Sequence, residues 1–163
     1  MIITTSRLIL RPFLKSDLSN LHHIMSNEDV ACLAGFATKK TLEETNIILN
    51  IFLKESPNSL WAIYYKNENK VLGWIELHSP SISIVDSKEI GFVLSKDYWG
   101  LGLMPEAILG LISYAFDTLN ITTLICSHFE NNIQSQKVIA KCGFKFIFKQ
   151  DSKLYYLLSF YTL

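Results

Sequence analysis

One stretch of the chain, residues 89–106 with the sequence EIGFVLSKDYWGLGLMPE, constrains the fold more than any other. Its first six residues, Glu89–Leu94, have the apolar character of a strand, and a short polar turn follows them. The next loop contains Gly100 and Gly102, and Pro105 suits the first position of a helix, where its missing N–H costs no hydrogen bond. The stretch therefore predicts a strand that enters a helix through a glycine loop.

A glycine loop at a helix start has the properties of an anion-binding site. The first N–H groups of a helix lack partners within the helix, and the helix dipole places partial positive charge there. Glycine also lets a phosphate approach the backbone closely. The chain has Pro105 where a dinucleotide-binding loop needs a third small residue, and it lacks the Gly-Lys-Ser/Thr run of a P-loop. On this pattern alone, phosphate binding and a plain tight connection both remain open.

The segments around this loop predict a mixed sheet. Leu60–Lys66 and Val71–Ser79 alternate apolar and polar residues, so they form an antiparallel meander with Glu89–Leu94. After the loop, Pro105–Leu119 repeats apolar residues at helical spacing, and Thr122–His128 is a β-branched strand. A strand, a helix and a strand in this order form a right-handed crossover, so the two strands are predicted to be parallel neighbours.

The rest of the chain predicts further helices and strands. On the N-terminal side we expect a strand at Thr4–Phe13, a helix capped by Ser16 or Asp17, and a helix at Leu42–Lys54. Between the two helices we expect a loop at Ser26–Lys40, with room for a short turn of helix. On the C-terminal side we expect a helix from Asn132 to Cys142, a left-handed residue at Gly143, and a hairpin of Phe144–Gln150 with Leu154–Tyr161. The predicted fold is α+β: a mixed, mostly antiparallel sheet of six to seven strands with about four helices, in one domain over residues 1–163.

Composition excludes several kinds of protein. Fifteen basic residues balance fifteen acidic ones, so no overall charge attracts nucleic acid or an anionic membrane. Cys32, Cys126 and Cys142 are odd in number and far apart, which argues against a disulfide framework and a zinc site. Arg7 and Arg11 come too early for a signal peptide, and no apolar segment reaches the ~20 residues of a membrane span. We expect a cytoplasmic protein without metal, nucleic acid or membrane partners.

Three segments in order resemble the GNAT acetyltransferases, and most closely their RimJ/RimL branch. They are SRLILRPF from Ser6, EIGFVL with KDYWGLGLMPEA between Glu89 and Ala107, and NNIQSQKVIAKCGF from Asn131 to Phe144. The resemblance implies the three-layer GNAT fold, with helices on both faces of the sheet. It also implies acetyl-CoA as donor and, as acceptor, a primary amine of a protein N-terminus or a small molecule. The acceptor amine would attack the thioester directly, without a covalent enzyme intermediate.

The resemblance also assigns residues to the donor. The two parallel strands splay apart to admit the pantetheine arm, and the first carries a bulge whose free N–H groups bind the thioester carbonyl. The residues implied in donor binding are Phe92, Val93, Leu94, Trp99, Gly100, Leu101, Gly102, Leu103, Met104, Asn132 and Ser135. The loop members would hold the pyrophosphate through their backbone N–H groups.

The chain departs from the family pattern at three positions. Asp97 and Leu101 stand where a basic or polar side chain is common, so phosphate binding would depend on backbone amides. Ile139 occupies the position of the tyrosine that protonates the leaving thiolate in many members, although the RimJ/RimL branch commonly lacks that tyrosine too. Ser135 is one substitute candidate, and water is the other. The missing tyrosine keeps an alternative open, namely a non-catalytic module that binds CoA or an acyl-CoA.

Each catalytic candidate has a simpler explanation beside it. Glu89 is the candidate general base, and its other reading is a charge at a strand end that faces solvent. Glu76 and His78, which share one side of the neighbouring strand, and His128 are further candidates. Asn132 is a candidate catalytic residue, but an N-cap explains it equally well. The candidate acid Ser135 is also a common residue at a helix start.

The sequence does not identify the acceptor or separate a monomer from a homodimer. The C-terminus, which ends in Tyr161–Leu163, predicts an apolar edge strand that could pair between two chains.

Overall fold

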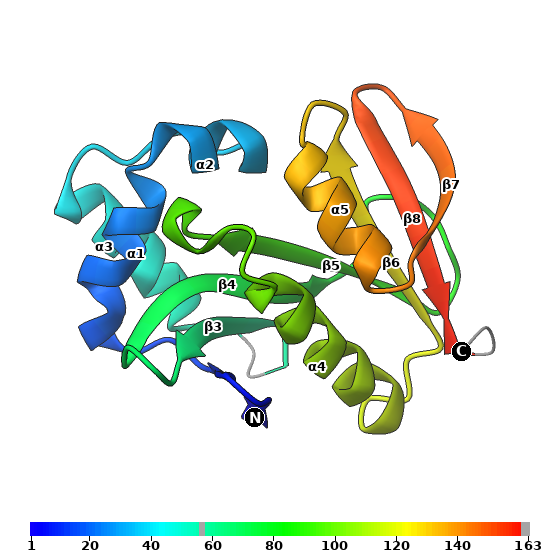
Figure 1. Ribbon diagram of the computed structural model, residues 1–163, viewed down its shortest axis with the longest axis horizontal. Coiled ribbons are helices and arrows are strands. Elements are labelled where there is room, and N and C mark those ends of the chain that lie inside the picture. Colours follow the sequence, from blue (N-terminus) through cyan, green and yellow to red (C-terminus); the bar gives the residue numbers. More distant parts are fainter. Residues whose placement is uncertain (56–57, 161–163) are drawn as a thin grey trace.

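The computed structural model describes residues 1–55 and 58–160, which form one mixed sheet with helices on both faces (Figure 1). The strand order is β1-β2-β3-β4-β5-β6-β8-β7. The strands are β1 Ile3–Thr4, β2 Leu8–Arg11, β3 Leu60–Tyr65, β4 Lys70–His78, β5 Ser87–Leu94, β6 Thr123–Phe129, β7 Lys145–Gln150 and β8 Lys153–Ser159. The helices are α1 Leu18–Met25, α2 Glu28–Ala34, α3 Leu42–Phe52, α4 Leu103–Asp117 and α5 Ile133–Lys141.

The core has two layers because the strands alternate their side chains between the faces of the sheet. On β3, Trp61 and Ile63 pack with α4 and α5, whereas Leu60 and Ala62 pack with α1, α2 and α3. All four side chains are buried. The predicted α+β fold, with a mostly antiparallel sheet and one parallel pair, is confirmed.

Two predicted segments differ from the structure near the N-terminus. Thr4–Phe13 is not one strand, because β1 and β2 are antiparallel partners joined by a turn in which the Thr5 N–H donates to the Leu8 carbonyl at 3.0 Å. The predicted loop at Ser26–Lys40 contains α2, which begins after the N-cap Asn27 and ends at Gly35 with φ 77°. With these differences, the described residues contain eight strands, against the six to seven predicted, and five α-helices, against about four.

Two further predictions are corrected at helix α4 and at the C-terminus. Helix α4 begins at Leu103, so Pro105 is its third residue and not its first. Proline is tolerated there because the N–H of that position also lacks a helical partner. The last strand, β8, lies between β6 and β7, so the predicted edge strand at the C-terminus is wrong and β7 is the edge. Residues 161–163 lie outside the described part of the chain.

Strands β5 and β6 are parallel neighbours that separate partway along their length (Figure 1). Their backbones pair from Ser87–Thr123 to Ile90–Cys126 and no further. Beyond that point β5 pairs only with β4, up to Leu94, and β6 pairs only with β8. The backbone groups on the open side of each strand therefore have no strand partner.

The bulge expected in β5 is absent from its register with β4, which is continuous along the described strands from Gly73–Leu94 to His78–Glu89. The backbones instead approach each other closely at Gly73. A Cβ there would lie 2.1 Å from the Val93 carbonyl oxygen, so only glycine fits.

Candidate functional site

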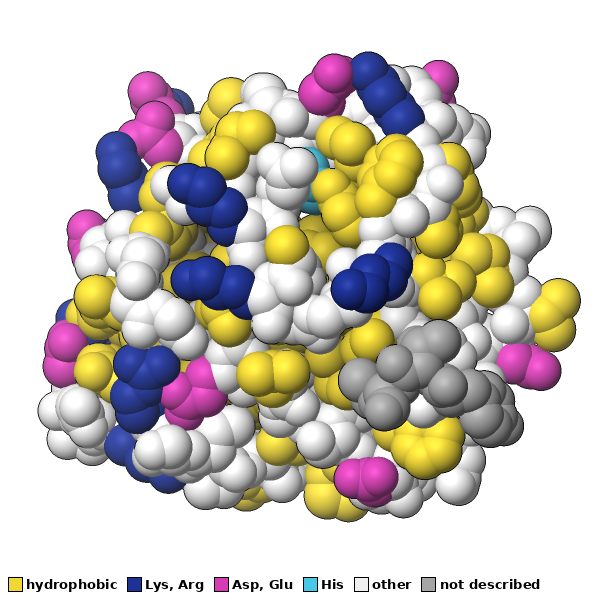
Figure 2. Space-filling model, turned by 45° about the vertical axis from the view of Figure 1, so that its right-hand side comes forward, with side chains coloured by type: hydrophobic (Ala, Val, Ile, Leu, Met, Phe, Trp, Pro, Cys, Tyr) yellow, Lys and Arg dark blue, Asp and Glu magenta, His cyan; other side chains and the backbone are white. Residues whose placement is uncertain are grey.

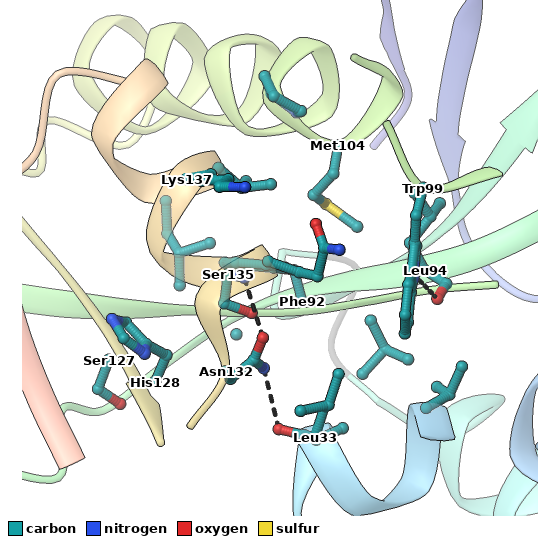
Figure 3. A pocket seen from close by; sticks show the side chains of 18 of the residues that line it. Leu33, Phe92, Leu94, Trp99, Met104, Ser127, His128, Asn132, Ser135 and Lys137 are labelled. Carbon is teal, nitrogen blue, oxygen red and sulfur yellow. Dashed lines mark hydrogen bonds between the residues drawn. The ribbon is translucent and has the colours of Figure 1, made fainter. Parts of the chain in front are cut away.

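A cavity of about 460 Å³ occupies the space where β5 and β6 separate. Its walls come from β5 and the end of β6, from parts of β4 and β8, from the glycine loop and the first turn of α4, from the length of α5, and from α2. Figure 2 shows hydrophobic and basic side chains gathered around a hollow on one face of the molecule. In Figure 3, Trp99 and Met104 lie on the other side of the cavity from Ser127 and His128.

The glycine loop presents unpaired backbone donors at one end of this cavity. Gly100 and Gly102 have φ angles of 81° and 72°, which favour glycine. Within the described residues, the N–H groups of Gly100, Leu101 and Gly102 have no hydrogen-bond partner. A Cβ at Gly100 would have nothing within 4 Å, so the space beside it is open. The loop leads into the 15-residue helix α4, whose dipole favours an anion at this place.

Of the side chains near the glycines, those of Asp97 and Leu101 lie outside the cavity, whereas that of Trp99 lines it. The Asp97 carboxylate is hydrogen-bonded to His23 at 2.8 Å and does not line the cavity, so it does not oppose an anion there. Leu101 is 54% exposed and also lies outside the lining. The Trp99 indole N–H donates to the Leu94 carbonyl at 2.9 Å and fastens the loop to β5 (Figure 3).

Asn132 joins two helices at the edge of the cavity (Figure 3). Its carbonyl oxygen accepts from the Ser135 N–H at 3.0 Å, which confirms the predicted N-cap of α5. Its amide nitrogen donates to the Leu33 carbonyl of α2, also at 3.0 Å. The Ser135 hydroxyl lines the cavity and has no hydrogen-bond partner among the described residues. Ile139 is fully buried and contributes nothing to the lining.

Three lysines that the sequence reasoning missed also line the cavity. Lys137 and Lys141 lie four residues apart on α5, and Lys153 lies on β8. In the described part of the chain, neither lysine of α5 has an acidic partner. Their i, i+4 spacing after the cap at Asn132 was the available signal, because it places both side chains on one face of the helix. They supply positive charge to the same cavity as the glycine loop.

Glu89 lies beside the last backbone pair of β5 and β6, at the base of the fork that these two strands form where they separate. Its side chain is only 4% exposed, so the alternative prediction for Glu89, a strand-end charge that faces solvent, is wrong. One carboxylate oxygen accepts from the N–H and hydroxyl of Ser81, each at 2.8 Å, and the other accepts from the Ser127 hydroxyl at 2.6 Å. Burial acts to raise the pKa of Glu89, but these hydrogen bonds outweigh it and hold the pKa below its ordinary value.

Glu76 is a second carboxylate on the cavity wall, in a different environment. It is opposite Gly91 of β5, where a Cβ would lie 2.5 Å from a Glu76 carboxylate oxygen, so glycine makes room for this side chain. No described residue donates a hydrogen bond to the carboxylate. Burial raises the pKa of Glu76, the charge of His78 opposes that shift, and the nearby carboxylates of Glu55 and Glu89 add to it.

The two candidate histidines are also in the lining. His78 is exposed, and its Nδ1 is hydrogen-bonded to the Ser79 carbonyl at 2.8 Å. His128 is buried, and both ring nitrogens have partners, at 2.7 Å from the Phe129 carbonyl and 3.1 Å from the Tyr156 hydroxyl. Both ring nitrogens of His128 are thus already engaged within the protein, whereas the Glu76 carboxylate accepts no hydrogen bond from a described residue.

Residues 1–55 and 58–160 contain neither a cluster of metal ligands nor a membrane-spanning helix. No three His, Cys, Asp or Glu side chains group closely enough there to hold a metal ion. None of the helices in those residues combines the length and apolar character needed to cross a bilayer. The three cysteines are free, and burial raises the pKa of the Cys142 thiol to about 11.

Comparison with known proteins assigns a family to this architecture. Residues 7–145 match the acetyltransferase (GNAT) domain. The uncharacterized N-acetyltransferase YoaA of Bacillus subtilis is 25% identical over 147 residues, which cover 88% of this chain and 82% of that protein. A GNAT-family acetyltransferase from Bacillus anthracis has the same fold, with a TM-score of 0.83, 24% identity and 98% of each chain covered. The ribosomal-protein-S5-alanine acetyltransferase of Vibrio fischeri superimposes with a TM-score of 0.71 at 16% identity, covering 98% of this chain and 96% of that one.

Proposed function

This chain belongs to the GNAT acetyltransferase family, and on that basis we propose that it transfers the acetyl group of acetyl-CoA to a primary amine. One observation carries the proposal. A single cavity, which opens where β5 and β6 separate, has unpaired N–H groups at a helix start at one end and, on the wall that β4 contributes, the Glu76 carboxylate with its raised pKa. This arrangement suits a reaction that must hold a diphosphate and accept a proton from an ammonium group.

The residues present fit CoA. The backbone of Gly100–Gly102 and the start of α4 would hold the pyrophosphate, and the open space at Gly100 leaves room for it. Lys137 and Lys141 would pair with further phosphate oxygens. The backbone of Phe92, Val93 and Leu94, which has no partner strand on the side of β6, would orient the thioester. When bound, acetyl-CoA supplies the activated acyl group.

We propose that Glu76 accepts the proton of the acceptor amine, directly or through a water molecule. A base for an ammonium group works best when its pKa is raised toward neutral pH, and Glu76 has this shift while Glu89 has the opposite one. Glu89 accepts three hydrogen bonds that would weaken if it were protonated. Glu89 remains a second candidate, and its hydrogen bonds suit it to holding the fork in place.

Ser135 is the candidate proton donor to the leaving thiolate. Its hydroxyl lies in the lining with no partner among the described residues, so it is available to a ligand. The amine would attack in a complex that holds both substrates, and alignment of the two would account for much of the rate. Asn132, with both ends of its amide engaged, would act by fixing the start of α5 beside the donor.

We propose a cytoplasmic enzyme of the RimJ/RimL type, as a monomer or homodimer, whose acceptor is a protein N-terminus or a small amine. The name of the Vibrio fischeri neighbour places N-terminal peptides of ribosomal proteins in the first acceptor panel.

Two measurements test this function. Calorimetry with CoA should give one site per chain, and absence of binding at about 1 mM CoA would overturn the proposal. Thiol release from acetyl-CoA should then be followed across a panel of small amines and N-terminal peptides. Binding of CoA without turnover of any acceptor would favour the alternative, a module of the same fold that binds CoA without catalysis.

A further inference from the structure

Arg7 lies outside the cavity and yet contacts the glycine loop. It is in the turn before β2, and its Nη1 donates to the Leu101 carbonyl at 3.1 Å, across 94 positions of sequence. Its Nε donates to the Glu106 carboxylate at 2.6 Å, and its backbone N–H donates to the other oxygen of that carboxylate at 2.7 Å. Arg7 therefore holds the chain on both sides of Gly102.

Glu106, in the first turn of α4, is a firm anchor for this contact. Besides Arg7, the Thr5 hydroxyl donates to its carboxylate at 2.6 Å. Burial acts to raise the pKa of Glu106, but the hydrogen bonds from Thr5 and Arg7 and the charge of Arg7 outweigh it and lower the pKa. The carboxylate is therefore ionised at neutral pH and fixes the guanidinium next to the loop.

The geometry of one peptide plane links this contact to the cavity. In a trans peptide, the carbonyl of Leu101 and the N–H of Gly102 lie in one plane and point in opposite directions. Arg7 binds that carbonyl from outside the cavity, so the Gly102 N–H turns toward the other side, where Gly102 lines the cavity. Without this contact, a loop with two glycines would sample several orientations of the plane.

We propose that Arg7 is a positioning residue for the acyl donor, which it never touches. It orients the Gly102 N–H for the diphosphate by holding the Leu101 carbonyl, with Glu106 as its anchor. The inference rests on the proposed function, because it supposes that the loop binds the diphosphate of CoA. The competing explanation is a salt bridge that only stabilises the fold.

Arg11, the last residue of β2, offers a matched control. Its guanidinium makes a two-pronged pair with Asp17, at 2.8 and 2.9 Å, and it does not contact the glycine loop. Arg11→Gln therefore removes a comparable ion pair without touching the proposed site. Arg7→Lys keeps a positive charge that can reach Glu106 or Leu101. It lacks the planar guanidinium, whose several N–H groups bond to both residues at once.

The experiment measures CoA binding by calorimetry, the KM for acetyl-CoA and for the acceptor, and urea unfolding for each variant. We expect Arg7→Gln to weaken CoA binding about tenfold, the size expected for one lost charged hydrogen bond, and to raise the KM for acetyl-CoA alone. The CoA affinity of Arg7→Lys should lie between that of Arg7→Gln and that of wild type. Arg11→Gln should lose stability without a change in CoA binding.

Each outcome decides one question. If wild type binds CoA and Arg7→Gln binds it equally well, Arg7 is not a positioning residue, whereas failure of wild type to bind CoA defeats the proposed function itself. An equal loss of CoA affinity in Arg7→Gln and Arg11→Gln would assign the effect to stability and overturn the inference. Should Arg7→Gln not fold, Arg7→Lys decides, since CoA binding equal to that of wild type would contradict the proposal.

Discussion

The Ser127 hydroxyl donates a 2.6 Å hydrogen bond to the Glu89 carboxylate across the point where β5 and β6 separate. The last backbone pair of the two strands is Ile90–Cys126, so this side-chain bond spans the base of the fork. Glu89 also accepts two hydrogen bonds from Ser81, which tie the preceding loop to the same carboxylate. The cavity between the strands thus begins at a buried carboxylate that accepts three hydrogen bonds.

Removal of the Ser127 hydroxyl should destabilise the fold at neutral pH. We expect Ser127→Ala to lower the free energy of unfolding by about 1–3 kcal/mol, because Glu89 loses a charged hydrogen bond in a buried place. Ser87→Ala is the control, since Ser87 donates to a neutral carbonyl, that of Ile84, at 2.7 Å and should cost about 1 kcal/mol. Urea unfolding of both variants gives the comparison.

This effect should depend on pH in one direction. The pKa of Glu89 is lower in the folded than in the unfolded state, so its stabilisation is present above the unfolded pKa and is lost as the pH falls through the folded pKa. The difference between wild type and Ser127→Ala should therefore shrink in acid. A difference that stays constant through the titration of Glu89 would contradict this account.

Glu76→Gln should lower activity and raise stability together. If Glu76 is the base, kcat should fall by about 10²–10⁴, the range for loss of a general base. The pKa of Glu76 is raised in the folded state, so its contribution to stability is full below the unfolded pKa and is lost as the pH rises through the folded pKa. Gln has no charge to bury, so the variant should unfold at a higher temperature than wild type at neutral pH.

One control and one further substitution test whether Glu76 or Glu89 is the general base. Glu55→Gln removes a charge near Glu76 outside the lining, and it should leave kcat nearly unchanged. For Glu89→Gln, an unchanged pH–rate profile would remove Glu89 as base. If Glu89→Gln instead abolished turnover while Glu76→Gln kept it, the assignment of Glu76 would be wrong.

Gly100→Ala should separate donor binding from backbone strain. Gly100 and Gly143 have φ angles of 81° and 86°, so alanine at either costs about 1–2 kcal/mol of unfolding free energy. Only Gly100 borders the cavity. We expect both variants to lose similar stability in urea and only Gly100→Ala to bind CoA more weakly in calorimetry. Equal CoA affinities would place the diphosphate elsewhere.

The lysines of α5 should contribute charge to donor binding. The double variant Lys137→Gln with Lys141→Gln should raise the KM for acetyl-CoA several-fold and make that KM less sensitive to salt, because screened phosphate contacts are lost. Lys145→Gln is the control, as Lys145 is an exposed lysine of β7 outside the lining. A KM for acetyl-CoA in the double variant equal to that of Lys145→Gln would remove both lysines from the site.

Much of the architecture was predictable because it depends on local rules. Alternation predicted β3 and β4, helical spacing predicted α4, and Asn132 was recognised as the cap of α5. The same rules could have found α2, since Asn27 caps its start and Gly35 ends it with positive φ. These features depend on residues within a few positions of each other, so the sequence is enough to infer them.

The sequence alone determined the strand, glycine loop and helix, and the resemblance that they support. The tertiary structure decided which side chains meet at the site. Glu76 and Glu89 are carboxylates on neighbouring strands, and the sequence does not distinguish their surroundings. In the folded chain Glu89 accepts three hydrogen bonds, whereas Glu76 accepts none from the described residues. Arg7 reaches Leu101 and Asn132 reaches Leu33 across more than 90 positions. Such contacts arise from packing of distant elements, and burial and hydrogen bonding at those contacts set the pKa of each group.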